Sequence, residues 1–161
     1  MFKVGDKVVY PMQGAGIIQG IEKMEFSEKC QKYYIIEILT NNLKIMIPSD
    51  KIANSNLRLI EDEDTLDHTL SDFNQKKPQV KENLSYKQRY QINMEKIRSG
   101  SLEENIEVVY DLTHIKKKKK NLNSTEKEIL IHAKKFLVDE ISLIKEITPK
   151  EATTLLNKTI N

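Results

Sequence analysis

The sequence predicts an α+β fold in two parts: a small β-barrel over residues 1–60 and a compact all-α domain of about five helices over residues 61–161. Three observations lead to this division. Apolar residues alternate with a period of two in the first part and recur about every 3.6 residues in the second. Four consecutive acidic residues, 61–64, separate the two patterns. A chain of 161 residues can also hold two small domains.

Short strands with glycine-containing turns account for the start of the barrel. Residues 7–10 form the first expected strand, and residues 17–21 supply the apolar positions of the second. Gly14 and Gly16 lie between them and permit backbone angles that other residues avoid. We therefore expect a tight turn at residues 14–16.

A hairpin completes the barrel. Residues 33–39 are rich in β-branched and aromatic side chains, residues 41–42 suit a turn, and residues 43–47 form a second arm that Pro48 closes. Side chains alternate between two faces along that arm, so Met46 should point outward. Four or five short strands avoid exposed flat edges by closing, or nearly closing, into an SH3-like or Tudor-like barrel.

Helix starts are marked by pairs in which Ser or Thr precedes Gln or Glu by three residues. The four pairs are Ser85 with Gln88, Ser101 with Glu104, Thr125 with Glu128, and Thr148 with Glu151. In the last pair, Pro149 directly follows Thr148 at the first helical position, which proline favours. Gly100 should end one helix, so that the next begins almost at once. A weaker helix is expected over residues 66–73, which gives about five helices with short connections.

Composition is typical of a globular protein, with 39% hydrophobic and 31% charged residues. No run approaches the roughly 20 apolar residues of a membrane helix, and the N-terminus lacks the pattern of a signal peptide. We therefore expect a cytoplasmic protein without a membrane partner. Cys30 is the only cysteine, which excludes an internal disulfide and a thiolate metal cluster.

Catalytic motifs are missing from the sequence. His68, His114 and His132 lie far apart and have no companion at metal-binding spacing. No phosphate-binding glycine motif or nucleophile elbow occurs, and the carboxylates fall at surface-like positions. We predict no enzyme activity, cofactor, metal or small-molecule substrate.

Positive charge gathers in the second part of the chain, where residues 76–161 contain 18 basic and 12 acidic residues although the whole chain carries only +2. At a helix start, the sequence Tyr-Lys-Gln-Arg-Tyr (residues 86–90) combines cations with aromatic rings. Cations can hold phosphates there while a ring pushes against unstacked base pairs. Helical spacing assigns Tyr90 to the core and leaves Tyr86 as the exposed wedge. The candidate DNA contacts of this cluster are Tyr86, Lys87, Gln88 and Arg89.

A second basic cluster is the lysine run at the end of another helix. It comprises Lys116, Lys117, Lys118, Lys119 and Lys120. These side chains either form a solvated helix end that suits the helix dipole or contact DNA phosphates without reading sequence. The sequence leaves both interpretations open.

The chain also resembles a known family. Residues 2–11 (FKVGDKVVYP), followed by GAG at residues 14–16, are similar to the opening of CarD-type transcription regulators and of the polymerase-interacting domain of transcription-repair coupling factors. The resemblance continues through IMIP at residues 45–48, RY at 89–90, NMEKI at 93–97, SG at 99–100 and VVYDL at 108–112. It covers nearly the whole chain, and the helical second part favours the CarD/CdnL type over the coupling factor.

The resemblance implies that the barrel binds the β subunit of RNA polymerase. It also implies that the helical domain meets the upstream edge of the promoter bubble in the minor groove, with weak sequence preference, and stabilises the open complex. The implied polymerase contacts are Lys23, Met24, Lys44, Met46, Ile47 and Pro48. Relatives in the family carry tryptophan where Tyr86 stands, and some of them carry arginines near Met24 and Met46, so a weaker wedge and a more apolar interface are expected here.

Two other functional classes stay open. In a protein-only interaction module, the helical domain would bind a partner helix and the lysines would only solubilise it. Salt-insensitive partner binding without a DNA footprint would favour that alternative. An uncharacterised small enzyme is the third class, although no residue set supports it. The sequence does not determine the promoters, the sign of regulation or the oligomeric state.

Overall fold

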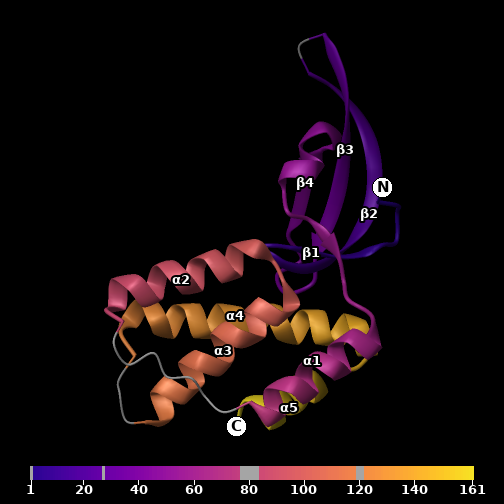
Figure 1. Cartoon of the computed structure of the whole chain (residues 1–161). Helices are drawn as coiled ribbons and strands as arrows, with labels where there is room; N and C mark the ends of the chain where they lie inside the picture. Colours follow the sequence, from indigo (N-terminus) through magenta and orange to yellow (C-terminus); the bar gives the residue numbers. More distant parts are fainter. Residues whose placement is uncertain (1, 27, 77–83, 119–121) are drawn as a thin grey trace.

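The computed structural model describes residues 2–26, 28–76, 84–118 and 122–161. A curved β-sheet stands on a helical domain, and the chain passes from one to the other between β5 and α1 (Figure 1). The strands are β1 (Lys7–Tyr10), β2 (Gly14–Phe26), β3 (Lys29–Ile38), β4 (Lys44–Pro48) and β5 (Arg58–Leu59), with the 3₁₀ helix η1 (Ser49–Asn54) after β4. The α+β fold class is confirmed.

The strands pair antiparallel in the order β4-β3-β2-β1-β5. Inward-facing side chains from these strands and from the loop before β5 form a separate core, made of Val8, Ile18, Tyr34, Ile36, Ile38, Ile47 and Leu57. On β4 the alternation is as predicted, because Met46 points outward and is 42% exposed. The strand order places β4 and β5 at the two edges of the sheet.

The turn expected at residues 14–16 is wrong. The chain turns at residues 11–13, where Met12 adopts a positive φ of 71°, and Gly14 already begins β2. Gly16 is needed for a different reason: a Cβ atom there would lie 2.3 Å from the Glu37 carbonyl oxygen of β3. The glycine therefore permits close strand pairing rather than a turn.

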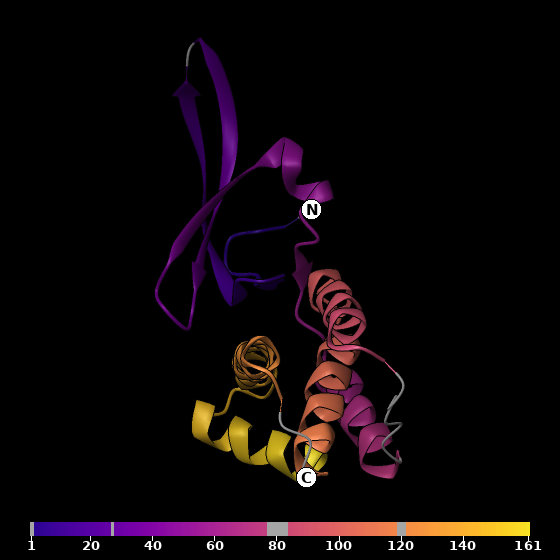
Figure 2. The same cartoon turned by 90° about the vertical axis from the view of Figure 1, so that its left-hand side faces the viewer.

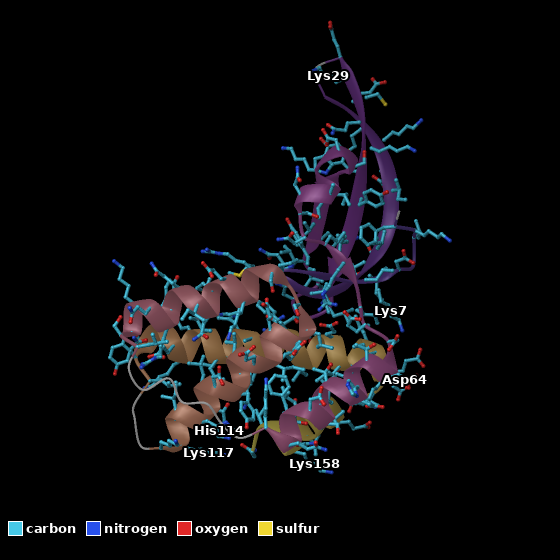
Figure 3. All side chains as sticks on the ribbon, in the orientation of Figure 1. Lys7, Lys29, Asp64, His114, Lys117 and Lys158 are labelled. Atoms are coloured by element: carbon cyan, nitrogen blue, oxygen red, sulfur yellow. The ribbon has the colours of Figure 1, made fainter. Side chains whose placement is uncertain are left out.

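β2 and β3 continue past the end of β4 as a two-stranded arm. Their pairing runs from Gly16–Ile38 to Phe26–Lys29, whereas β4 pairs only with residues 33–37 of β3. Lys29 lies at the tip of this arm, at the end remote from the helical domain (Figure 3). The register shifts between Ile18 and Gly20, which is where a β-bulge bends the hairpin.

The described part of the second domain contains five helices, as predicted. They are α1 (Glu63–Gln75), α2 (Tyr86–Ser99), α3 (Leu102–Lys117), α4 (Ser124–Lys145) and α5 (Pro149–Ile160). Their inward faces form one core, in which Ile106, Leu112 and Ile141 are fully buried. Figure 2, which views α4 end on, shows the helices gathered beneath the sheet. No helix in the described part of the chain is long and apolar enough to span a membrane.

Three of the four predicted helix caps are confirmed. The side chains of Ser85, Ser101 and Thr148 each accept a hydrogen bond from the backbone N–H three residues later. The cap predicted at Thr125 is wrong, because Asn123 caps α4 through the backbone N–H of Glu126. Asparagine at this position is as good a cap as serine or threonine.

A buried ion pair joins the two domains. From β5, Arg58 donates two hydrogen bonds to Glu140 of α4, from Nη1 at 2.8 Å and from Nη2 at 2.7 Å. Its Nε donates a third, of 2.6 Å, to the carbonyl oxygen of Gly100. One guanidinium thus ties the sheet to α4 and to the α2–α3 corner, with a geometry that only arginine provides.

Close backbone packing reinforces that junction. Gly100 ends α2 with a φ of 74°, and a Cβ atom there would lie 2.7 Å from the Pro11 ring. Lys7 reaches the other end of the junction, where its Nζ lies 3.4 Å from the Leu143 carbonyl oxygen and 3.5 Å from Glu146 (Figure 3). The sheet and the helices are therefore held together at several points.

Candidate nucleic-acid interface

The N-terminal end of α2 presents an exposed tyrosine on a rigid base. Ser85 and Gln88 form a reciprocal capping box: the Gln88 N–H donates to Ser85 Oγ, and the Ser85 N–H donates to Gln88 Oε1. The capping box fixes the first turn of the helix. Tyr86 lies in that turn and is 53% exposed, as the sequence predicted. Gln88 was predicted to contact DNA, and its side-chain oxygen is engaged in this cap.

Arg89 forms the support behind Tyr86. Its guanidinium lies 4.5 Å from the centre of the Tyr86 ring and donates two hydrogen bonds to Glu126, of 3.2 Å from Nε and 3.0 Å from Nη2. The hydrogen bonds to Glu126 are the main reason why the pKa of Arg89 is raised above its ordinary value. The guanidinium is thus held in a fixed plane against the tyrosine.

Glu126 is a site residue that the sequence analysis missed. Its side chain is 1% exposed, and its backbone N–H is the one capped by Asn123. A buried carboxylate normally needs a partner, and Arg89 supplies it from 37 positions earlier in the chain. The predicted role of Arg89 as a phosphate contact therefore needs revision, because its side chain is largely committed inside the protein.

Tyr90 was predicted in the core, and this is wrong. The side chain is 39% exposed and lies between two adjoining cavities of about 330 and 310 Å³ that run between α2 and α4. The first cavity is lined by Tyr86, Lys87, Tyr90, Asn123, Thr125 and Glu126. The second continues toward the sheet, past Met94 and Phe136 to Met12. Ile97, one turn beyond Met94, makes the contact with the core instead.

The predicted lysines occupy two separate places. Lys87 is exposed beside Tyr86 in the first turn of α2. Lys116, Lys117 and Lys118 are exposed at the end of α3, whereas residues 119 and 120 of the run lie outside the described residues. Figures 1 and 2 show the end of α3 at a different corner of the helical domain from the start of α2.

The predicted polymerase contacts fall on both faces of the sheet. On β4, Lys44, Met46 and Pro48 share the outer face, next to Ile35 of the neighbouring strand. Ile47 is a wrong assignment, because the alternation of the strand turns it inward and leaves it only 5% exposed. Its backbone lies on the edge strand, but its side chain belongs to the core.

The other two predicted contacts lie on the arm that β2 forms with β3. Lys23 pairs with Lys32 and Met24 with Gln31, beyond the end of β4. Successive residues of a strand face opposite sides, so these two side chains are not part of one patch. Among the described residues, no group of three or more His, Cys, Asp or Glu side chains is close enough to hold a metal.

Comparison with known proteins agrees with this architecture. Residues 2–60 match the family model described as the CarD-like/TRCF RID domain, and residues 72–157 match the model of the CarD C-terminal domain. A Bacillus subtilis (strain 168) protein named "Putative transcription factor YdeB" is 45% identical over 151 residues, which is 94% of this chain and 97% of that protein. The solved structure of CdnLNt from Myxoccoccus xanthus is 47% identical, covers 33% of this chain and 75% of its own, and has a TM-score of 0.31.

An N-terminal sheet domain of the RID type, joined to a helical domain, defines a class of transcription regulators that interact with RNA polymerase. This class is not a class of enzymes. The chain belongs to the CarD family, since both parts match the family's models and nearly the whole length aligns with a curated relative.

Proposed function

We propose that the sheet domain binds the β subunit of RNA polymerase while α2 brings Tyr86 against the upstream edge of the promoter bubble, so that the protein stabilises the open complex. Such a protein works in the cytoplasm with the polymerase. The observation that carries the proposal is the pairing of an exposed Tyr86 ring with a fixed guanidinium behind it. An aromatic side chain that served only packing would be buried, whereas the Tyr86 ring is exposed.

A wedge stabilises the open complex only if it contacts melted DNA better than closed DNA. A ring that stacks on a base exposed at the fork has no such partner in an intact duplex. Lys87 beside the ring adds phosphate affinity that does not depend on sequence. With these two side chains, the protein would bind melted DNA better than closed DNA and would distinguish little between base sequences.

On the sheet, the outer face of β4 is the best candidate for the polymerase contact. β4 is an edge strand, so part of its backbone is available for pairing with a strand of another protein. Met46 supplies an exposed apolar side chain on that strand, and Lys44 supplies charge. An edge of this kind fits a partner that adds a strand.

The junction between the domains gives the two contacts a fixed relation. Arg58 and Gly100 hold the C-terminal end of α2 against the sheet, and the 14 residues of the helix place Tyr86 at its other end. A helix of that length spans about 21 Å. A sheet anchored on the polymerase would thus hold the ring at a set distance from its anchor.

The wedge is tested by measuring the lifetime of open complexes formed by the cognate polymerase with Tyr86→Ala and Tyr86→Trp. Loss of one stacked base should shorten the lifetime by roughly five- to 100-fold, and tryptophan should lengthen it. Ile131→Ala is the matched control, because Ile131 is exposed on α4 outside the two cavities. An unchanged lifetime with Tyr86→Ala would remove the wedge from the proposal.

The polymerase contact is tested by capture of fragments of the β subunit. Met46→Glu should abolish capture, whereas Ile131→Glu, an equally drastic change on the helical domain, should not. If capture persists for Met46→Glu, the contact lies elsewhere on the sheet. If the wild type binds polymerase in a salt-insensitive way and leaves no footprint on DNA, the protein-only module is the correct function.

A further inference from the structure

The cavity at the start of α2 is lined by aromatic, polar and charged side chains. It measures about 330 Å³ and lies between the first turns of α2 and α4. Two aromatic rings, Tyr86 and Tyr90, line it from α2, one helical turn apart on the same face. Asn123 and Thr125 line it from α4, and Lys87 stands at its rim.

Both tyrosines of α2 that line the cavity are exposed, Tyr86 at 53% and Tyr90 at 39%. Tyr90 is 39% exposed, while the apolar side chains of Met94 and Ile97 on the same helix pack against the core. Arg89 covers one face of the Tyr86 ring, which leaves its other surfaces to meet a ligand. The cavity is therefore lined by two partly exposed aromatic rings.

The polar groups around the rings favour a ligand with a polar edge and a negative charge nearby. Asn123 uses its side-chain oxygen to cap α4, which leaves its amide nitrogen as a donor, and Thr125 adds a hydroxyl group. Lys87 contributes a cation at the rim. The carboxylate of Glu126 also lines the cavity, but its charge is balanced by Arg89.

We propose that this cavity binds an unpaired nucleobase of single-stranded DNA, stacked between Tyr86 and Tyr90, while Lys87 contacts the adjoining phosphate. Stacking on tyrosine suits any base, because every base has an aromatic face. The amide of Asn123 and the hydroxyl of Thr125 meet the polar edge of the base. The volume of the cavity, about 330 Å³, is at the small end of ligand pockets.

This inference rests on the proposed function and deepens it. The proposed function needs only the contact of Tyr86 with a base exposed at the fork, whereas here the same base is also bound by Tyr90 and by the polar groups of the cavity. Tyr90 then becomes a contact residue for DNA, and not only a neighbour of the wedge. The captured base belongs to the strand that leaves the duplex at the fork.

The test uses the full-length chain without polymerase and a fork-junction DNA in which 2-aminopurine replaces one unpaired base at a time. Stacking quenches this base, so the wild type should quench it at one position next to the duplex. Tyr90→Ala should lose the quenching and bind the fork roughly five- to 100-fold more weakly, the range expected when a stacking ring is removed. Tyr90→Phe keeps the ring and should behave like the wild type.

Three results would overturn the inference. The wild type could fail to quench any position, Tyr90→Ala could quench as the wild type does, or Tyr90→Ala could weaken polymerase capture in the absence of DNA, which would identify a protein side chain as the occupant. The thermal midpoint shows whether each variant is folded. Failure of the proposed function is seen separately, as an open-complex lifetime that Tyr86→Ala leaves unchanged.

Discussion

Replacing Glu126 by glutamine separates two roles that Arg89 could have. If Arg89 contacts phosphates directly, removal of a neighbouring negative charge should strengthen DNA binding. If Arg89 instead positions Tyr86, the same change should weaken the action on the open complex, because the guanidinium loses its anchor. The two hypotheses thus predict opposite signs.

The size of the effect follows from burial. Breaking a buried ion pair by removing one partner costs about 3–5 kcal/mol. Glutamine keeps one acceptor for the guanidinium and Arg89 retains some contact with solvent, so we expect a loss of about 2–3 kcal/mol. In a protein of this size that lowers the melting temperature by about 4–12 °C. The variant should stay folded at 25 °C, with Tyr86 less firmly held.

The assay compares open-complex lifetimes and the salt dependence of DNA binding for Glu126→Gln, Arg89→Lys and Glu107→Gln. We expect the first two variants to shorten the lifetime about tenfold without changing the salt slope. Glu107→Gln is the control, since it breaks the ion pair of Glu107 with Lys96 at 3.0 Å, which lies outside the cavity. The positioning role is refuted if Arg89→Lys retains full activity, or if Arg89→Ala lowers the salt slope by about one, as loss of a phosphate contact would.

Three further predictions concern the junction and its surroundings. Gly100→Ala should lower the free energy of unfolding by about 2 kcal/mol or more, since alanine must adopt a φ of 74° and meets the Pro11 ring, whereas Gly20→Ala, with nothing within 4 Å, should be tolerated in a urea titration. Arg58→Lys should keep capture by polymerase but shorten the open-complex lifetime, because the donors of an ammonium group lie on one nitrogen and cannot match the planar fork that reaches Glu140 and Gly100 together; equal loss of both would contradict this. Burial raises the pKa of Asp139 from 3.8 to about 6, so the folded state holds a proton that the unfolded state releases, and stability falls as the pH rises from about 4 to 6. Asp139→Asn should therefore stabilise the protein at pH 7 by about 1–2 kcal/mol, after allowance for partial exposure, and should give no gain at pH 4; a gain independent of pH would exclude titration as the cause.

Local patterns in the sequence were sufficient for most of the elements. The caps at Ser85, Ser101 and Thr148 depend on hydrogen bonds within four residues, and the helix end at Gly100 depends on its own backbone angle. Alternation along β4 likewise placed Met46 outward. Errors arose where two local signals competed, as at the start of α4, where Asn123 rather than Thr125 is the cap.

The candidate site was only partly predictable. Tyr86 was recognised because exposure at a helix start can be read from the helical period. Tyr90 was misplaced because the same period cannot tell whether a partner helix covers that position. The side chain of Ile47 could have been assigned correctly, since its own alternation already turned it inward. For Glu126, the one available signal was a carboxylate in the first turn of a helix, which is common on protein surfaces.

The sequence alone thus determined the two-part α+β organisation, the starts of α2, α3 and α5, and the exposed aromatic ring at the start of α2, because these follow from periodicity and from contacts between near neighbours. Only the tertiary structure decided that Arg89 belongs to Glu126, that Tyr90 faces a cavity, and that Arg58 joins the domains through Glu140. Each of these depends on residues between 37 and 82 positions apart, or on two helices that meet through the fold. Such pairings arise when separate helices and strands pack together. The spacing of residues along one helix or strand carries no information about that packing.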